Sequence, residues 1–160
     1  VDSNLLRIMK DCGCVEVGMG VESGNQEILD IINKNIKVED AVRVCNWCHE
    51  IGLRIKTFLI IGLPGESKES VKDTIEFLRK ARPDDYDISV YNPFPKTDIW
   101  DNIQNYNIKF NKDSLDYSKM FYKGVTGNYT SQVSTSSLTS EEIERLRDYI
   151  DIDIRNEIYE

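Results

Sequence analysis

The sequence predicts an α/β protein in which helices cover parallel β-strands, and two observations lead to this class. The first is an apolar run without alternation at Phe58–Ile61, which ends in turn residues at Gly62, Pro64 and Gly65. Such a run is typical of a strand buried on both faces by helices. The second is the alternation of strand-like and helix-like segments, with connections long enough for parallel pairing. Ligands bind at the C-terminal ends of parallel strands, so we expect this turn to face a ligand.

The first part of the chain contains signals for three helices and two strands. The helices are expected at residues 2–10, 25–32 and 37–51, and the strands at residues 14–21 and 58–61. The third helix has the clearest signals, because its apolar residues recur at helical spacing. Gly52 then follows at the position where a left-handed glycine ends a helix.

The βα alternation continues to about residue 105. A helix at residues 67–81 stops before Pro83, a strand follows at residues 86–91, and a short helix is expected at residues 97–104. Because helices separate the successive strands, we expect consecutive βα units of one parallel sheet.

The composition changes after residue 105, where Ser, Thr, Asn and Tyr become frequent. Short strands are expected near residues 108–110 and 129–134. A final amphipathic helix is expected at residues 139–159, since Thr139 and Glu142 fit a capping box. Its apolar stripe consists of Ile143, Leu146, Ile150 and Ile154. We therefore divide the chain into residues 1–105 and a C-terminal extension, residues 106–160.

Composition narrows the class of protein. The chain has 160 residues, of which 40% are hydrophobic and 30% charged, as in soluble globular domains. Its net charge of −8 argues against nonspecific nucleic-acid binding, which needs a basic surface. We expect a cytoplasmic protein with reduced thiols and no membrane segment, because no secretory signal or long apolar run is present. The chain begins at Val1 without an initiating Met, which we interpret as a piece of a longer protein.

Two strand ends carry polar or turn residues that suit a binding site. Glu22 and Ser23 follow a strand that contains two glycines, and they could hydrogen-bond a ribose or an ammonium group. The alternative is a helix start that Ser23 or Asn25 caps. The turn at residues 62–66 lacks the Lys-Ser/Thr ending of a phosphate loop and the glycine spacing of a dinucleotide fingerprint. Its alternative is a tight βα turn.

A third strand end, at residues 92–95, carries two prolines. The prolines could fix one wall of a binding site, and Phe94 could cover a flat ring of the ligand. The alternative is a rigid loop without a binding role.

No catalytic residue and no metal site are predicted in this chain. Cys45 and Cys48 have metal-ligand spacing, but they lie on the apolar face of a predicted helix, which favours core packing. Cys12 and Cys14 have the wrong spacing to complete a zinc site. His49, the single histidine, falls in the middle of a helix, where we expect it to be solvated.

Three segments at these distances and in this order resemble the second half of a radical S-adenosylmethionine (SAM) domain. They are residues 15–24, 60–66 and 91–97. The resemblance covers about residues 1–105. It is strongest to the branch that includes methylthiotransferases and cobalamin-binding enzymes of the anaerobic magnesium-protoporphyrin cyclase type. It implies the C-terminal half of a partial (β/α)6 barrel with parallel strands, followed by an extension that ends in the helix at residues 139–159.

The resemblance also implies a chemistry, in which a [4Fe–4S] cluster cleaves SAM reductively to a 5′-deoxyadenosyl radical. It places eight residues at the cofactor. Glu22 and Ser23 are expected to contact the ribose and the methionine portion of SAM. The residues expected along the adenine are Ile60, Ile61, Gly62 and Pro64. Asn92 and Pro93 are expected at the exit of the last strand, near the adenine or the substrate.

One departure from the family pattern limits what this chain can do. The C-x3-C-x2-C triplet that holds the cluster is absent, so we expect the chain alone to be inactive and the parent protein to supply the cluster. The resemblance also admits a cobalamin bound by an N-terminal domain, a small-molecule substrate, and self-association through an uncovered sheet edge. Two alternatives remain open: a stand-alone βα module that binds a nucleotide or other small molecule, and a degenerate, non-catalytic partner domain.

Overall fold

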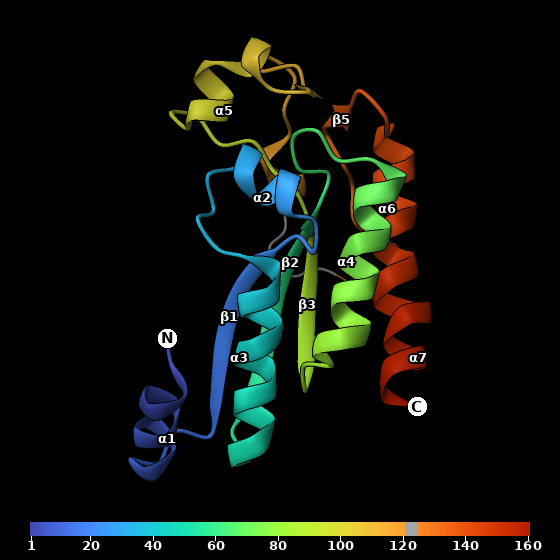
Figure 1. Ribbon diagram of the computed structural model, residues 1–160. Coiled ribbons are helices and arrows are strands. Elements are labelled where there is room, and N and C mark those ends of the chain that lie inside the picture. The colour runs from blue at the N-terminus through green and yellow to red at the C-terminus, as the bar shows by residue number, and fades with distance from the viewer. Residues whose placement is uncertain (121–124) are drawn as a thin grey trace.

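The fold is a three-stranded parallel sheet with helices on one face, as Figure 1 shows for the computed structural model. The structure describes residues 1–120 and 125–160. The strands are β1 (Glu16–Glu22), β2 (Arg54–Ile61) and β3 (Asp85–Val90), in the order β1-β2-β3. The predicted α/β class with parallel strands is confirmed. Within the described ranges, no helix is long and apolar enough to cross a membrane.

The helices of the first part lie where the sequence predicts them, to within two residues. They are α1 (Ser3–Asp11), α2 (Gln26–Ile31), α3 (Val38–Ile51) and α4 (Lys68–Ala81). Local signals set their ends. Gly52 adopts a left-handed conformation with φ 66° after α3, and Ser67 forms a capping box at the start of α4.

After β3 the chain continues with short elements and ends with one long helical segment. The short elements are α5 (Asp98–Asp101), η1 (Ile103–Asn105), β4 (Ile108–Lys109), η2 (Tyr117–Lys119) and β5 (Ser134–Thr135). The strand predicted near residues 108–110 is β4, whereas the strand predicted near residues 129–134 shares only Ser134 with β5; β4 and β5 pair antiparallel. The long segment consists of α6 (Ser140–Tyr149), the π-helical η3 (Ile150–Ile154) and α7 (Arg155–Tyr159). The predicted capping box of Thr139 and Glu142 is confirmed.

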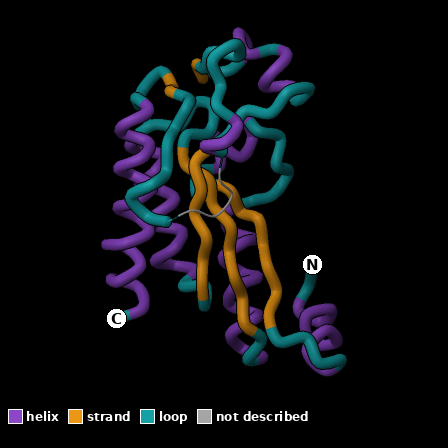
Figure 2. Tube along the Cα trace, turned by 180° about the vertical axis from the view of Figure 1, so that it is seen from behind, coloured by secondary structure: helices purple, strands orange, loops and turns teal. Residues whose placement is uncertain are grey.

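The prediction that β2 is buried on both faces is wrong. Alternate residues Ile55, Leu59 and Ile61 are buried, whereas Phe58 and Ile60 are only partly buried. The reason is visible from behind in Figure 2, where the strands lie in front and the helices cover only their far side. The apolar residues of β2 therefore lie in two different environments. One face packs against the helices, and the other lines an open concave face of the sheet.

Two arginines from the C-terminal helix cover the outer edge of β3. Tyr91 N donates to Ile61 O, so alternation turns the carbonyls of Tyr86 and Ile88 away from β2. Arg155 Nη2 donates to Tyr86 O at 2.6 Å, and Arg147 Nε donates to Ile88 O at 3.0 Å. These guanidinium groups satisfy the edge carbonyls that a neighbouring strand would otherwise pair with.

The same arginines are neutralised and stacked. Asp151 lies between them, 3.0 Å from Arg147 Nη2 and 2.8 Å from Arg155 Nη2. Arg147 stacks on Tyr129 at 3.8 Å and Arg155 on Tyr86 at 4.0 Å from the ring centroids. Burial alone would raise the pKa of Asp151, but hydrogen bonds from Thr126 and Arg155 and the charge of Arg147 hold it below its usual range.

We expect Arg147→Leu to destabilise the fold by about 3 kcal/mol, because Arg147 is 3% exposed and its loss leaves Ile88 O without its donor and Asp151 with only one of its two cations. Chemical denaturation measures the change. The matched control is Arg145→Leu, an exposed position of the same helix, where the free energy of unfolding should change by less than about 0.5 kcal/mol. Equal effects of the two substitutions would contradict the edge role of Arg147.

Gly24 brings the loop after β1 into direct contact with α4. A Cβ atom at Gly24 would lie 2.5 Å from both Asp73 O and Thr74 Cα. In addition, Gly24 N donates to Thr74 Oγ1 at 2.9 Å. Only glycine permits this approach, because the atoms in conflict belong to the backbone of a packed helix.

Gly24→Ala should therefore destabilise the protein by about 2 kcal/mol or more, since the added methyl group has no space. Gly18→Ala is the control. Its Cβ meets the far end of the Phe58 ring at 2.9 Å, and that side chain can move. Urea midpoints of the two variants and the wild type test the prediction, which fails if Gly24→Ala is no less stable than Gly18→Ala.

Candidate functional site

A cavity of 320 Å³ lies at the C-terminal end of the open face of the sheet. The strand register brings its lining together, because Gly20 lies beside Phe58, Phe58 beside Asp87 and Ile60 beside Ser89. All three strands contribute, as ligand sites at parallel strand ends require. The lining residues are Gly20, Glu22, Phe58, Leu59, Ile60, Asp87 and Ser89.

A carboxylate and an ammonium group meet at the rim of this cavity. Lys34 Nζ lies 2.6 Å from Glu22 Oε1, and both side chains remain partly exposed, by 30% and 19%. A register shift between Gly20 and Glu22 ends the regular pairing of β1, and Glu22 adopts φ 69°. This strained conformation is rare for a residue with a side chain and is typical of functional positions.

Gly20 makes room for the pair. A Cβ atom there would lie 2.6 Å from Glu22 Oε1 and 3.2 Å from Lys34 Nζ. The glycine thus lets a carboxylate and an ammonium group lie across the backbone of β1. The sequence contains the signal for Glu22 and Gly20, but the contribution of Lys34 depends on how the chain returns after α2.

Ser23 lies inside the protein and does not line the cavity. It is 0% exposed, and its hydroxyl accepts a hydrogen bond from Asn25 N at 3.2 Å and contacts Thr74 Oγ1 at 3.4 Å. Asn25 caps α2 by accepting from Ile28 N at 3.0 Å. Ser23 therefore supports the loop from the interior of the protein. This agrees with the alternative interpretation of residues 22–25 as a helix start, with Asn25 as the cap.

The turn after β2 is organised by the buried carboxyl group of Glu66. Glu66 is 0% exposed, and its Oε2 accepts a hydrogen bond from Gly62 N at 2.5 Å. Burial raises the pKa of Glu66 to about 8, against the opposing effect of hydrogen bonds from Gly62 and Leu63. Its Oε1 is buried and receives no hydrogen bond from the residues that the structure describes.

The C-terminal extension holds the same turn from the other side. Thr135 Oγ1 donates to Glu66 O at 2.7 Å, and Gly65 N donates to Asn107 O at 3.2 Å. Gly62 and Gly65 have φ values of 90° and 81°, which a glycine adopts without strain. The turn is therefore fixed by its own carboxyl group and by two residues distant in sequence.

The structure brings together two of the eight residues expected at a ligand, Glu22 and Ile60, in one cavity. Ile61 faces the helices, and the remaining residues adjoin the same end of the sheet. Gly62, Pro64 and Pro93 are buried, and Asn92 is partly buried. Asn92 Oδ1 is buried and receives no hydrogen bond from any described residue, which leaves an acceptor available at the exit of β3.

Sequence reasoning missed Lys34, Phe58, Leu59, Asp87 and Ser89. A period of two along β2 would have found Phe58, because it lies on the same face as Ile60. The register of a parallel sheet would then have placed Asp87 and Ser89 beside them.

The cysteines lie elsewhere. Cys45 and Cys48 are 0% exposed and belong to the core, as predicted, and burial raises the pKa of Cys45 to about 12. Cys12 is exposed and Cys14 is partly buried, and neither lines the cavity. Among the described residues, no group of three or more His, Cys, Asp or Glu side chains could hold a metal ion.

Comparison with known proteins identifies relatives of this chain. Residues 1–78 match the Radical SAM superfamily. An uncharacterized methyltransferase of Pyrococcus horikoshii is 31% identical over 100 residues, which cover 62% of this chain and 22% of the relative. The anaerobic magnesium-protoporphyrin IX monomethyl ester cyclase of Rubrivivax gelatinosus is 28% identical over 99 residues, 62% of this chain and 18% of the relative. The chain thus spans about a fifth of the length of these relatives.

A solved structure shares the fold. The radical S-adenosylmethionine methyltransferase TsrM from Kitasatospora setae, with cobalamin and a [4Fe–4S] cluster bound, aligns with a TM-score of 0.61 and 19% identity. The alignment covers 72% of this chain and 24% of TsrM. The fold is therefore part of a partial barrel of parallel strands and helices, with a C-terminal extension that ends in a helix.

The buried carboxyl group of Glu66 predicts a pH-dependent stability. Its folded-state pKa of about 8 lies above the ordinary value of 4.5, so its contribution is complete below about pH 4.5 and is lost as the pH rises through 8. The wild type should lose several kcal/mol of stability, to order of magnitude, between about pH 5 and about pH 9 relative to Glu66→Gln.

Urea denaturation at both pH values checks this prediction. Glu69→Gln, an exposed substitution three residues away, is the control and should keep the pH dependence of the wild type. Parallel pH profiles for the wild type and Glu66→Gln would show that Glu66 does not titrate in this range.

Proposed function

Because residues 1–78 match the Radical SAM superfamily, we propose that this chain binds S-adenosylmethionine at the strand ends of its sheet. In this proposal it forms part of a larger enzyme that cleaves SAM reductively. The observation that carries the proposal is the Glu22–Lys34 pair, which lies across Gly20 at the rim of a cavity with apolar walls.

The amino-acid end of SAM carries an ammonium group and a carboxylate. Glu22 offers a carboxylate to the first and Lys34 offers an ammonium group to the second. In the proposal, each group exchanges part of its present ion pair for the opposite charge of the ligand. Glu22 can also accept a hydrogen bond from a ribose hydroxyl group, as expected from the sequence.

The adenosine end needs a flat apolar surface and a few polar partners. Ile60 and Phe58 provide apolar walls in the cavity. Asn92 Oδ1, a buried acceptor that no described donor satisfies, suits the exocyclic amino group of adenine. The proposal places Ile61, Gly62, Pro64 and Pro93 around this end as the rigid frame of the two turns. Ser23 supports the same loop without lining the cavity in this structure.

The residues present do not fit a [4Fe–4S] cluster. The sequence has no C-x3-C-x2-C triplet, and two of its four cysteines are buried in the core. We therefore propose that the cluster belongs to a part of the whole protein outside this chain and that this chain alone is inactive. SAM, when bound beside a reduced cluster, supplies the 5′-deoxyadenosyl group of radical chemistry.

The proposal for the whole protein is a cytoplasmic enzyme of the oxidative cyclase or methyltransferase type that acts on a small molecule. The named relatives support these two classes. Cobalamin enters the proposal only for the whole protein, because it is bound in the structural neighbour TsrM. The net charge of −8 does not favour a nucleic-acid substrate. Self-association through an open sheet edge is also part of the proposal.

Titration calorimetry with SAM tests the binding function on this chain. The wild type should bind SAM, and Lys34→Met should lower the affinity at least about tenfold, because it removes the charge opposite the ligand carboxylate. Lys37→Met is the control, since Lys37 is exposed and lies three residues after Lys34. The affinity of this variant for SAM should equal that of the wild type. A folded wild type that binds no SAM would contradict the proposal, as would an unchanged affinity of Lys34→Met.

A further inference from the structure

The buried carboxyl group of Glu66 is a titratable group that the proposed binding of SAM does not use. It lies in the turn after β2, where its Oε2 accepts a hydrogen bond from Gly62 N at 2.5 Å. The backbone N–H group of Leu63 also donates to this carboxyl group. One side chain thus satisfies two consecutive amide groups at the start of the turn. It closes the turn on itself, as a capping side chain closes the first turn of a helix.

This turn begins at the wall of the cavity. Ile60 lines the cavity, and Ile61 directly precedes Gly62. Ile61 O accepts a hydrogen bond from Tyr91 N at 2.8 Å, so the start of the turn is also tied to the exit of β3. The amide group that Glu66 holds therefore lies two residues from the cavity wall. A change in the turn moves this wall with it, because packed interiors transmit small displacements.

Neighbouring helices hold the turn from two sides through apolar contacts alone. A Cβ atom at Gly62 would lie 3.1 Å from Ile143 Cγ2 of α6. One at Gly65 would lie 3.0 Å from Ile31 Cδ1, at the end of α2. These isoleucine side chains cannot accept a hydrogen bond from the amide groups at the start of the turn. The conformation of residues 62 and 63 consequently depends on the carboxyl group.

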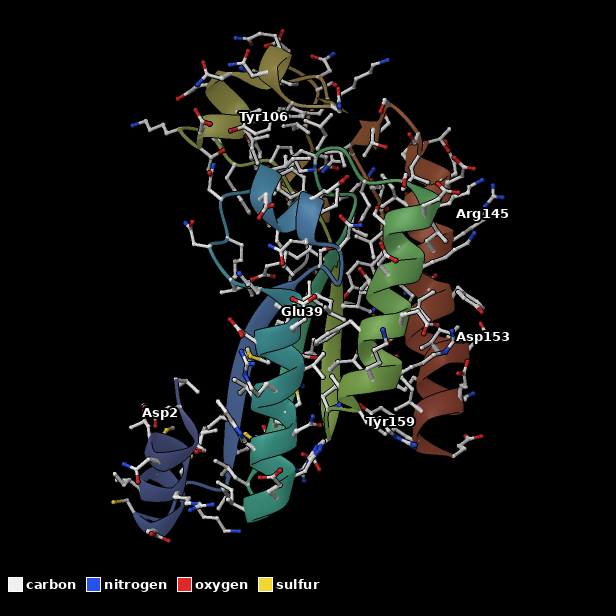
Figure 3. All side chains as sticks on the ribbon, viewed as in Figure 1. Asp2, Glu39, Tyr106, Arg145, Asp153 and Tyr159 are labelled. Atoms are coloured by element: carbon white, nitrogen blue, oxygen red, sulfur yellow. The ribbon has the colours of Figure 1, made fainter. Side chains whose placement is uncertain are left out.

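The charged residues of the surrounding elements have other partners or are exposed. Lys68 Nζ, at the start of α4, lies 2.6 Å from Glu142 Oε1 of α6. Glu144 Oε1 accepts a hydrogen bond from Ser131 N at 2.7 Å. The exposed ones are Glu27 and Asp30 of α2, Lys109 of β4 and Arg145 of α6. Figure 3 shows Arg145 pointing away from the sheet. The charge state of Glu66 is therefore set by its own burial and hydrogen bonds.

The second oxygen of the carboxyl group decides which charge state fits the closed turn. Oε1 is buried and receives no hydrogen bond from the described residues. On an ionised carboxylate this oxygen would carry buried charge without a partner, which is costly, whereas a proton removes the charge. Burial accordingly raises the pKa of Glu66 to about 8. The neutral form fits the closed turn, and the ionised form gains free energy by moving into water.

We propose that Glu66 is a positioning residue for the adenosine end of SAM and that the charge of its carboxyl group selects between two states of the turn. The neutral group holds the turn closed, with Ile60 in place as a wall for adenosine. The ionised group leaves the interior, the turn opens, and the affinity for adenosine falls. The inference rests on the proposed SAM site and adds to it a coupling between proton binding and ligand binding.

5′-Methylthioadenosine is the probe that isolates this coupling, because it contains the adenosine of SAM without the amino acid. It carries no charge that changes between about pH 6.5 and about pH 9.5. The closed turn needs the protonated group, so affinity is lost as the pH rises through about 8. Titration calorimetry should give the wild type at least about a tenfold weaker affinity at about pH 9.5 than at about pH 6.5. Circular dichroism at each pH confirms that the protein remains folded.

Three variants separate this coupling from a purely structural effect. Glu66→Gln keeps an uncharged acceptor for Gly62 N, so its affinity should equal that of the wild type at about pH 6.5 and stay constant to about pH 9.5. Glu66→Ala removes the acceptor and should bind at least about tenfold more weakly than Glu66→Gln at both pH values. Glu69→Gln, at an exposed position three residues away, should keep the pH profile of the wild type.

Parallel pH profiles for the wild type and Glu66→Gln would overturn the inference and leave the SAM site intact. Equal affinities of Glu66→Ala and Glu66→Gln would overturn it as well. A folded wild type that binds the probe at no pH would contradict the SAM site itself, and the inference with it.

Discussion

The one-sided burial of β2 is the constraint on which the rest of the structure depends. Ile55, Leu59 and Ile61 pack against the helices, and this fixes which residues of the central strand face the other way. Phe58 and Ile60 consequently line the open face, and the register carries the choice to β1 and β3. A shift of one residue along β2 would turn the cavity lining into the core. The site is thus a consequence of how the helical face is packed.

Two loops then complete the site, and both are held by groups that do not touch it. Gly24 fits against α4 with no space for a side chain, so the loop that carries Glu22 has a fixed position. The turn after β2 wraps around the buried carboxyl group of Glu66, and Thr135 fixes that turn from the C-terminal extension. The extension therefore serves two structural purposes, because its helix also closes the edge of β3. Rigid support of this kind positions side chains for a ligand without local rearrangement.

Much of the fold follows from local signals in the sequence. Ser67, Gly52 and Thr139 mark helix ends through capping and left-handed geometry, and these marks were sufficient to place α3, α4 and α6. The face of β2 could not be predicted, because Phe58 and Ile60 are apolar on the open side and erase the period of two. The burial of Arg147 could not be predicted from the sequence. Its partners, the carbonyl group of Ile88 and the ring of Tyr129, come from distant parts of the chain. The Glu22–Lys34 pair likewise depends on a register shift and on the path of the chain after α2.

The central claim is that SAM occupies the strand-end cavity between the Glu22–Lys34 pair and the exit of β3. The most direct measurement is the map of amide chemical-shift changes in the NMR spectrum of this chain during a titration with SAM. The account predicts that the largest changes fall on Gly20, Glu22 and Ile60, which line the cavity, on Lys34, which pairs with Glu22, and on Asn92 after β3. Changes confined to the groove that Val71 and Ile75 of α4 line together with Leu146 of α6, or no changes at saturating SAM, would contradict it.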